Sequence, residues 1–300
     1  MTASVGALLA LGAEQLKEAG IADSRWDSEV LLMHAMGIQR ARLYAHMDDA
    51  VASDIQGIFL DMIQQRATCM PVQYITGHQE FMGMEFYVAP GVLIPRPETE
   101  HVVETALSLA KDQPVLQLVD LGIGSGAIAI SIARYHPGAK IYGVDISADA
   151  LTIAHKNIHR YQLEGRITTV HGDLWEALTC SGMDGRVDGI VSNPPYIADK
   201  EMDMLEQQVK DYEPLTALSG GADGLDFYRR ILDGLDRFLA PQGWIVLEVG
   251  AGQGVAVKHL MDQTGILEPA QVVHDYMGWE RVLWSRRKQP MSHLQDEGYA

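Results

Sequence analysis

The chain has 300 residues, which is enough for one large domain or two modest domains with an adequate hydrophobic core. Its hydrophobic content of 47% and charged content of 21% are normal for a soluble globular protein. The net charge of −17 and the isoelectric point near 4.9 disfavour a broad phosphate-binding surface, which needs clustered lysine and arginine, and so lower the expectation of a nucleic-acid partner.

The cysteines and the apolar runs bear on the compartment. Cys69 and Cys180 fit neither a metal-binding spacing nor a disulfide framework, which indicates a reducing compartment. No uninterrupted apolar run approaches the roughly 18–20 residues that a membrane helix needs. The N-terminal segment lacks the charged-then-apolar pattern of a signal peptide, and it carries Glu14 and Glu18 where a transit peptide would be rich in arginine. We therefore expect a cytoplasmic protein with no membrane partner.

The residues up to 72 have a helical pattern. Apolar residues recur at helical spacing up to Gly20, which is a stop signal, and a second helix is predicted through residues 30–32 to Gly37. A third apolar stripe, within residues 55–63, follows the i, i+3, i+4, i+7, i+8 spacing. We predict a small helical bundle over residues 1–72, and we expect it to dock a partner because it carries no obvious catalytic groups.

The pattern changes over residues 73–95. Residues 74–76 and 86–88 are rich in aromatic and β-branched side chains, and Gly77 and Gly83 punctuate them. The segment 73–95 is therefore predicted to be a linker that contains a short β-hairpin.

A new helix is predicted to begin at Pro97, because proline suits the first position of a helix. Glu98 and Glu100 follow it, and acidic side chains are stabilising near the positive end of a helix dipole. We favour this structural role for both glutamates.

Strands and helices alternate after residue 112. The predicted strands are short apolar runs without strict alternation, as buried parallel strands are, at residues 115–121, 141–145, 167–171, 189–192 and 244–249. The helices predicted between them cover residues 127–134, 148–161, 225–239 and 254–261. Two further β-like runs lie around Val272 and Val282, and residues 287–300 form a polar tail. The pattern predicts a doubly wound α/β domain over residues 96–286.

A glycine-rich loop follows the first of these strands and opens a helix. Its glycines allow a tight turn and let a ligand approach the backbone beside the N–H groups of the helix N-terminus. We call this segment the glycine loop, and it consists of Gly122, Ile123, Gly124, Ser125 and Gly126. Alone, it also fits a nicotinamide dinucleotide, because Ala127 completes the longer G-x-G-x-x-G/A pattern.

Two aspartates lie at the ends of the next two strands. Asp145 ends the second strand, where a carboxylate is placed to accept both hydroxyls of a ribose. Asp173, with Leu174, follows the third strand and is placed to hold the amine and the ring of an adenine. Either aspartate could instead cap the helix that follows it.

The fourth strand ends in a turn that distinguishes a site for a nicotinamide dinucleotide from a site for S-adenosylmethionine. We call it the proline turn, and it consists of Asn193, Pro194, Pro195 and Tyr196. Two prolines cannot continue a strand inside a sheet, so the strand must stop at Ser192 and present a rigid rim. The rim offers a side-chain amide, a backbone carbonyl and an aromatic face, which suit a planar –NH2 group. Hydride transfer needs no such turn, so the glycine loop, the two aspartates and this turn together indicate a methyltransferase that uses S-adenosylmethionine.

The chain resembles the release factor glutamine methyltransferases (the HemK or PrmC family) over residues 5–285. Besides the glycine loop and the proline turn, the segments that carry the resemblance are residues 71–77, 93–100, 144–147, 212–214 and 220–225. The Pro-Glu-Thr-Glu stretch at residues 97–100 matters most, because a sibling family that modifies a glutamine of a large-subunit ribosomal protein differs there. Ile123 departs from the family, in which threonine is common, and a loop lined by backbone should tolerate it. Arg96, Glu248 and Gln253 match the family but receive no role beyond framing the cofactor pocket.

The resemblance implies a fold, an activity and a substrate. The fold is a seven-stranded, Rossmann-like class I methyltransferase domain behind a small helical N-terminal domain. The methyl donor is S-adenosylmethionine, and the acceptor is the glutamine of the Gly-Gly-Gln motif in class I peptide-chain release factors. The expected cofactor contacts are the glycine loop, Asp145, Asp173, Leu174 and Asn193, and the expected substrate contacts are the four residues of the proline turn.

The proposed chemistry assigns catalysis to Asn193, Pro194 and Tyr196. An amide nitrogen is a poor nucleophile because its lone pair is delocalised, so the site must supply alignment rather than a strong base. The Asn193 side-chain oxygen and the Pro194 carbonyl would each accept one amide hydrogen, and the Tyr196 ring would stack on the amide. No metal is required.

Three other functions stay open. Adenine methyltransferases use a similar turn on the exocyclic amine of a nucleic-acid base, but this acidic chain shows no basic segment that would anchor phosphates. A ribosomal protein is an alternative glutamine-bearing substrate. A non-catalytic nucleotide-binding or docking protein is opposed by Asn193 and by the glycine loop.

Overall fold

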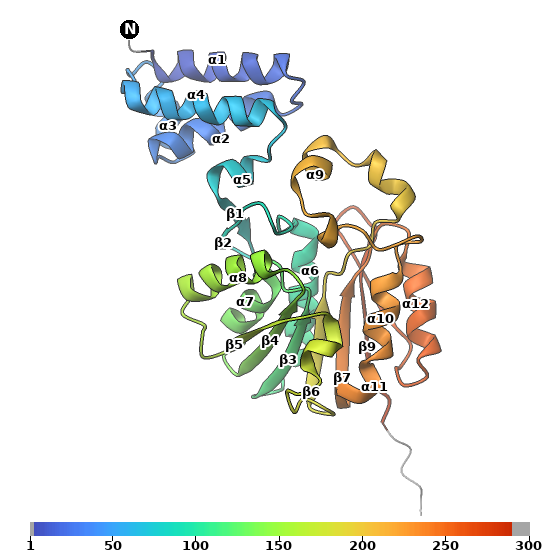
Figure 1. Ribbon diagram of the computed structural model, residues 1–300. Helices are drawn as coiled ribbons and strands as arrows, with labels where there is room; N and C mark the ends of the chain where they lie inside the picture. The colour runs from blue at the N-terminus through green and yellow to red at the C-terminus, as the bar shows by residue number, and fades with distance from the viewer. Residues whose placement is uncertain (1–2, 290–300) are drawn as a thin grey trace, which may run out of the picture. The chain divides into compact units, whose positions relative to one another are not determined.

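The computed structural model describes residues 3–289, and Figure 1 labels their helices and strands. The chain divides into two compact units. The first contains the residues up to 79 together with 87–90 and 203–213, and the second contains 80–86, 91–202 and the residues from 214 onward. The segment 203–213 therefore belongs to the first unit, although it lies far along the chain.

The first unit is built from helices. They are α1 (Val5–Glu18), α2 (Ser24–Met36), α3 (Arg40–Ala45), α4 (Ser53–Ala67), α5 (Val72–Thr76) and α9 (Gln207–Tyr212). Ser4 caps α1 by accepting a backbone hydrogen bond at 3.3 Å, and α2 ends at Gly37 in the left-handed conformation. The three helices predicted before residue 64 are confirmed. The sequence did not indicate α3, because this six-residue helix buries only Leu43 and so shows no apolar repeat.

A buried ion pair lies beside the apolar core of the first unit. Arg66 Nε donates to Asp27 Oδ2 at 2.6 Å, and both side chains are almost entirely buried. A second nitrogen of Arg66 donates to Gln208 Oε1 at 3.3 Å, and the Tyr212 hydroxyl donates to the Thr68 carbonyl at 2.8 Å. These contacts tie segment 203–213 to α4 and its C-terminal turn.

The predicted hairpin exists, but the prediction for residues 74–76 was wrong. These residues form α5, because Pro71 begins the turn and the Thr76 hydroxyl donates to the Val72 carbonyl at 3.0 Å. Gly77 then ends the helix at a φ of 75°. The hairpin follows as β1 (His78–Phe81) and β2 (Met84–Tyr87). The β-branched and aromatic composition of residues 74–76 therefore gave way to local capping.

The second unit contains a seven-stranded sheet, which confirms the predicted fold class. The strand order is β5-β4-β3-β6-β7-β9-β8, and only the pairings that involve β9 are antiparallel. The strands are β3 (Leu116–Leu121), β4 (Ala139–Asp145), β5 (Ile167–His171), β6 (Val187–Ser192), β7 (Leu239–Glu248), β8 (Gln271–His274) and β9 (Glu280–Arg286). The five predicted parallel strands and the two later β-like runs all lie within these bounds or differ from them by a few residues.

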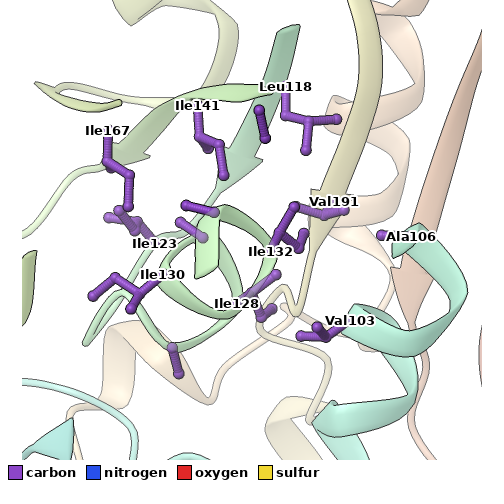
Figure 2. Close-up of a cluster of buried hydrophobic side chains, with 14 of the residues drawn as sticks. Val103, Ala106, Leu118, Ile123, Ile128, Ile130, Ile132, Ile141, Ile167 and Val191 are labelled. Atoms are coloured by element: carbon purple, nitrogen blue, oxygen red, sulfur yellow. The ribbon is translucent and has the colours of Figure 1, made fainter. Parts of the chain in front are cut away.

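Helices cover both faces of this sheet (Figure 1). One face packs against α6 (Glu100–Ala110), α7 (Ala127–Tyr135) and α8 (Ala148–Arg160), and the other against α10 (Asp226–Asp233), α11 (Leu235–Phe238) and α12 (Gly254–Gln263). Short 3-10 turns complete the chain at η1 (Pro97–Thr99), η2 (Leu174–Leu178), η3 (Asp199–Met204) and η4 (Leu215–Ala217). Figure 2 shows how Ile128, Ile130 and Ile132 of α7 pack among strand side chains such as Leu118 and Ile141. This packing fixes the helix that begins directly after the glycine loop.

The single helix predicted over residues 225–239 is two helices, which meet at Gly234. A Cβ at Gly234 would lie 2.2 Å from the Trp175 ring, so the close contact with the indole requires glycine there.

The predicted polar tail 287–300 lies outside the described residues from residue 290 onward. Within residues 3–289 no helix combines the length and the apolar character that crossing a membrane requires.

Candidate active site

The carboxyl ends of β3, β4 and β6 open onto one pocket in the second unit. The chain passes from β3 outward to β4 and β5 and then returns to β6 on the other side of β3, so the pocket lies where the strand order reverses. Its empty volume is about 990 Å³, solvent at the mouth included. The walls come from the segment before η1, the glycine loop, the ends of β4 and β5, and the proline turn.

The glycine loop has a backbone that only glycine adopts easily. Gly122, Gly124 and Gly126 have φ values of 80°, 53° and 85°, which strain any residue with a Cβ. The N–H of Gly122 donates to the Val144 carbonyl at 2.8 Å, which fastens the loop to the end of β4. All the loop residues line the pocket except Gly126, which lies against Ile130 of α7.

Asp145 and Asp173 both line the pocket, as predicted, but they have different partners. The Asp145 carboxylate accepts from the backbone N–H of Gly124 and of Ser147, each at 2.9 Å, and burial is the main cause that raises its pKa. Asp173 Oδ1 pairs with Arg230 at 2.7 Å, and Leu174 beside it has a φ of 44°. Asp145 therefore fixes the shape of the glycine loop, whereas Asp173 stays half-exposed at the wall.

The proline turn begins where the sequence predicted. Strand β6 ends at Ser192, whose hydroxyl donates to the Leu121 carbonyl at 2.6 Å and so joins the ends of β6 and β3. Asn193, Pro194 and Pro195 line the pocket. Tyr196 is not among the described residues that do, and its hydroxyl points to Glu248 Oε1 at 3.5 Å. Stacking of the Tyr196 ring on a substrate amide therefore stays a prediction.

Beneath the turn lies a chain of side-chain hydrogen bonds. Asn193 Nδ2 donates to Thr99 Oγ1 at 3.1 Å, and the Thr99 hydroxyl donates to Glu248 Oε2 at 2.6 Å. Burial, first among the causes, raises the pKa of Glu248 to about 7 and also raises the pKa of Tyr196. The sequence did not reveal that Thr99 and Glu248 support Asn193, because 149 residues separate Thr99 from Glu248.

The backbone of the proline turn is also held from behind. Gln253 Nε2 donates to the Tyr196 carbonyl at 2.8 Å, and Gln253 Oε1 accepts from the Gly250 N–H at 3.2 Å. Gly220 and Gly224 pack against the same backbone, since a Cβ on either would lie within 2.8 Å of a Tyr196 atom. The available signal was the Gly-Gly-Ala-Asp-Gly-Leu segment of residues 220–225, because closely spaced glycines can mark a close approach of two backbone segments.

Curated relatives place the chain in a family. The release factor glutamine methyltransferase of Moorella thermoacetica is 42% identical over 275 residues, which cover 92% of this chain and 95% of that protein. The protein of the same name from Geobacter sulfurreducens is 39% identical, over 90% of this chain and 92% of that protein. The chain belongs to the release factor glutamine methyltransferases. Family models agree, with a PrmC N-terminal domain matched at residues 7–77 and a methyltransferase small domain at residues 104–211.

Solved structures show the same fold in other methyltransferases. The hMettl16 catalytic domain in complex with the MAT2A 3'UTR hairpin 1 superposes with a TM-score of 0.56 at 16% identity, over 77% of this chain and 85% of that one. At this identity the likeness concerns the fold alone. The chain is thus an enzyme that uses S-adenosylmethionine as its methyl donor, and its fold is that of the class I methyltransferases.

Replacing Asp145 by asparagine is expected to raise the dissociation constant for S-adenosylmethionine about 10-fold. An asparagine has one acceptor oxygen, so either the Gly124 or the Ser147 N–H loses its charge-assisted bond, which is worth about 1.5–3 kcal/mol. Isothermal titration with the donor measures the change. Asp188→Asn is a control in the same sheet, because Asp188 accepts from the Gln117 N–H away from the pocket. If the wild type and Asp145→Asn bind S-adenosylmethionine with equal affinity, the prediction that Asp145 is a cofactor contact is contradicted.

A second carboxyl below the glycine loop makes stability depend on pH. Asp120 at the end of β3 is 0% exposed, and burial raises its pKa to about 7. The Ala129 N–H lowers that pKa in part, but its approach falls short of a well-formed hydrogen bond. Between about pH 4 and 7 the folded enzyme therefore keeps a proton that the unfolded chain has released, so stability falls as pH rises through this window.

The variant Asp120→Asn removes this titration. From pH 5 to pH 8, its free energy of unfolding relative to the wild type should rise by roughly 2–3 kcal/mol, because only the wild type must ionise a buried acid. Urea titrations followed by tryptophan fluorescence measure the unfolding, to which Trp175 and Trp244 contribute because both are buried in the second unit. Parallel pH curves for the two proteins would rule out a raised pKa at Asp120.

Proposed function

We propose that this enzyme transfers a methyl group from S-adenosylmethionine to the side-chain amide nitrogen of the glutamine in the Gly-Gly-Gln motif of class I release factors. The observation that carries the proposal is the orientation of Asn193. Its Nδ2 is committed to Thr99, which leaves Oδ1 as the acceptor on a pocket-lining side chain. An acceptor at this position suits the N–H of a carboxamide substrate and disfavours a carbonyl or a carboxylate.

The chain's own residues would align the acceptor nitrogen. Asn193 Oδ1 and the Pro194 carbonyl would each accept one hydrogen of the glutamine amide, and Tyr196 would stack on its plane. Positive charge that develops on the nitrogen is then shared with two oxygen acceptors. Holding the reacting atoms roughly 3–3.5 Å apart lowers the barrier by several kcal/mol through orientation alone. The rigidity of the proline turn serves this alignment.

The pocket residues fit the methyl donor. A Cβ built on Gly122 meets nothing within 4 Å, so a ligand has open access to the backbone of the glycine loop there. Asp145 would take the ribose hydroxyls, and Asp173 with Leu174 would take the adenine, while Asn193 would contact the donor as well as the substrate. When bound, S-adenosylmethionine supplies an electrophilic methyl group on a sulfonium, whose positive charge makes the thioether a good leaving group.

A release factor fits the charge of this chain better than a nucleic acid does. The net charge is −17, which opposes a phosphate backbone and favours a protein surface with basic residues. The helices of residues 1–72 would dock the partner. The linker of residues 73–95 would connect them to the methyltransferase domain of residues 96–286. The free cysteines Cys69 and Cys180 suit a reducing cytoplasm, where translation termination takes place.

The deciding experiment offers three acceptors in parallel. The purified enzyme is incubated with S-adenosylmethionine carrying a labelled methyl group and with a class I release factor, a ribosomal protein fraction or DNA. We expect label in the release factor, at the glutamine of the Gly-Gly-Gln motif by peptide mass spectrometry, and none in a release factor with Gln→Ala at that position. Label that survives the Gln→Ala change, or that appears chiefly in another acceptor, refutes the proposal.

A further inference from the structure

Three side chains from three separate elements form a hydrogen-bonded relay below the proline turn. Glu248 ends β7 and is 2% exposed, Thr99 lies in η1 and is 4% exposed, and Asn193 follows β6. The distances are 2.6 Å between Thr99 Oγ1 and Glu248 Oε2 and 3.1 Å between Asn193 Nδ2 and Thr99 Oγ1. At this burial each of these bonds has a large effect on the orientation of its partners.

The direction of this relay follows from counting hydrogens. A carboxylate only accepts, so the single hydrogen of the Thr99 hydroxyl must go to Glu248, and the hydroxyl oxygen must then accept from Asn193. The Asn193 amide is therefore held with Nδ2 toward Thr99 and Oδ1 on the other side. A protonated Glu248 would instead donate to Thr99, and the hydroxyl would be free to donate to Asn193 Oδ1. The amide would then turn its NH2 group toward the substrate.

The reversed relay is incompatible with a carboxamide acceptor. The substrate amide presents N–H donors, and the NH2 of a reversed Asn193 is also a donor, so the two groups would face each other without an acceptor. We propose that Glu248 is a positioning residue whose negative charge, relayed by the Thr99 hydroxyl, orients Asn193 for methyl transfer. This inference rests on the proposed function, since it assigns the polarity of the group that receives the glutamine.

The surroundings of Glu248 place its ionisation near neutrality. Arg281 of β9, itself paired with Asp275 at 2.8 Å, favours the carboxylate, whereas Glu98 of η1 disfavours it. Burial outweighs both and raises the pKa of Glu248 to about 7. Two tyrosines complete the shell, with the Tyr196 hydroxyl 3.5 Å from Oε1 and the Tyr228 hydroxyl donating to the Glu248 carbonyl at 2.9 Å. Arg96 also belongs to these surroundings, because its positive charge acts on Tyr196 and partly offsets the rise that burial causes in the pKa of that hydroxyl.

The first test is the pH profile of kcat with donor and release factor at saturation. For the wild type we expect kcat to rise about 10-fold per pH unit below 7 and to level off above pH 8, because the carboxylate is the competent form. Glu248→Gln should be flat over pH 6–8, since a side-chain amide does not titrate in this range, with kcat at pH 8 about 10-fold below the wild type. If kcat of Glu248→Gln still rises with pH near pH 7 as it does in the wild type (the pH limb of the profile), the inference is overturned.

The second test separates orientation from folding. Thr99→Val removes the relay hydroxyl but keeps the shape of the side chain, and it should lower kcat about 10–100-fold, abolish the pH limb and leave the KM for the donor nearly unchanged. Thr99→Ser restores the hydroxyl and should recover most of the rate together with the limb. A Thr99→Val enzyme that keeps the wild-type limb, or a Thr99→Ser enzyme that fails to regain it, argues against a relay.

A readout without turnover keeps this inference distinct from the proposed function. The infrared band of a protonated carboxyl, taken as the difference between the wild type and Glu248→Gln, should disappear as pH rises through about 7 in the free enzyme. A titrating band without methylation of the release factor refutes the proposed substrate. Methylation with a pH profile that neither Glu248→Gln nor Thr99→Val alters refutes the relay.

Discussion

The variant Asn193→Ala is expected to lower kcat for glutamine methylation about 10²–10³-fold, the cost of removing one aligned polar group from a reaction centre. Alanine deletes the oxygen proposed to accept from the substrate amide and leaves the Thr99 hydroxyl without the Asn193 donor. The dissociation constant for S-adenosylmethionine should change by less than about 5-fold, because the other proposed donor contacts, the glycine loop and Asp145, also line the pocket and are left intact. Single-turnover rates and donor titrations measure the two quantities separately.

A buried asparagine elsewhere in the same unit provides the comparison. Asn157 of α8 donates from Nδ2 to the Ser125 carbonyl at 2.9 Å, so Asn157→Ala disturbs the glycine loop rather than the proline turn. We expect it to weaken donor binding and to affect the saturated rate much less. If Asn193→Ala turns over at a near-normal rate, or if both variants lose only donor affinity, Asn193 has no part in the chemistry.

Much of the fold could be predicted because local signals agreed with tertiary packing. The central strands of the parallel sheet are buried on both faces, so β3 and β6 are apolar runs without strict alternation. Proline stops β6 at Ser192 whatever surrounds it. The prediction failed at residues 74–76, where β propensity was outweighed by Pro71, by the Thr76 hydroxyl and by Gly77.

The candidate site likewise has one part that the sequence reveals and another that only the folded structure shows. The glycine loop and the proline turn are continuous segments whose residue types limit their own backbone, so a sequence can reveal them. The support below the turn comes from Thr99, Glu248 and Gln253, which meet only when η1, β7 and α12 are packed together. A buried glutamate at the end of an apolar strand is a signal that something must pair with it, but it does not identify the partner.

Replacing Gly220 by alanine is the second change with a large expected effect. The added Cβ would lie 2.8 Å from the Tyr196 Cα and 2.8 Å from the Gly224 carbonyl oxygen, and both are backbone atoms that must shift. Gly220 lies outside the positive-φ region, so steric contact rather than dihedral strain causes the effect. A displacement of the proline turn by about 1 Å should lower kcat roughly 100-fold, while the affinity for S-adenosylmethionine changes little.

The matched control is Gly165→Ala, in the turn before β5, where a new Cβ meets nothing within 4 Å and φ is not positive. Its rate and its melting temperature should equal those of the wild type. Gly220→Ala should remain folded, with a stability loss of about 1–3 kcal/mol, because overpacking at one contact costs that much. A folded Gly220→Ala enzyme with wild-type kcat would show that the glycines behind Tyr196 do not hold the turn in place. The glutamine amide would then have to be aligned by the proline turn without that support.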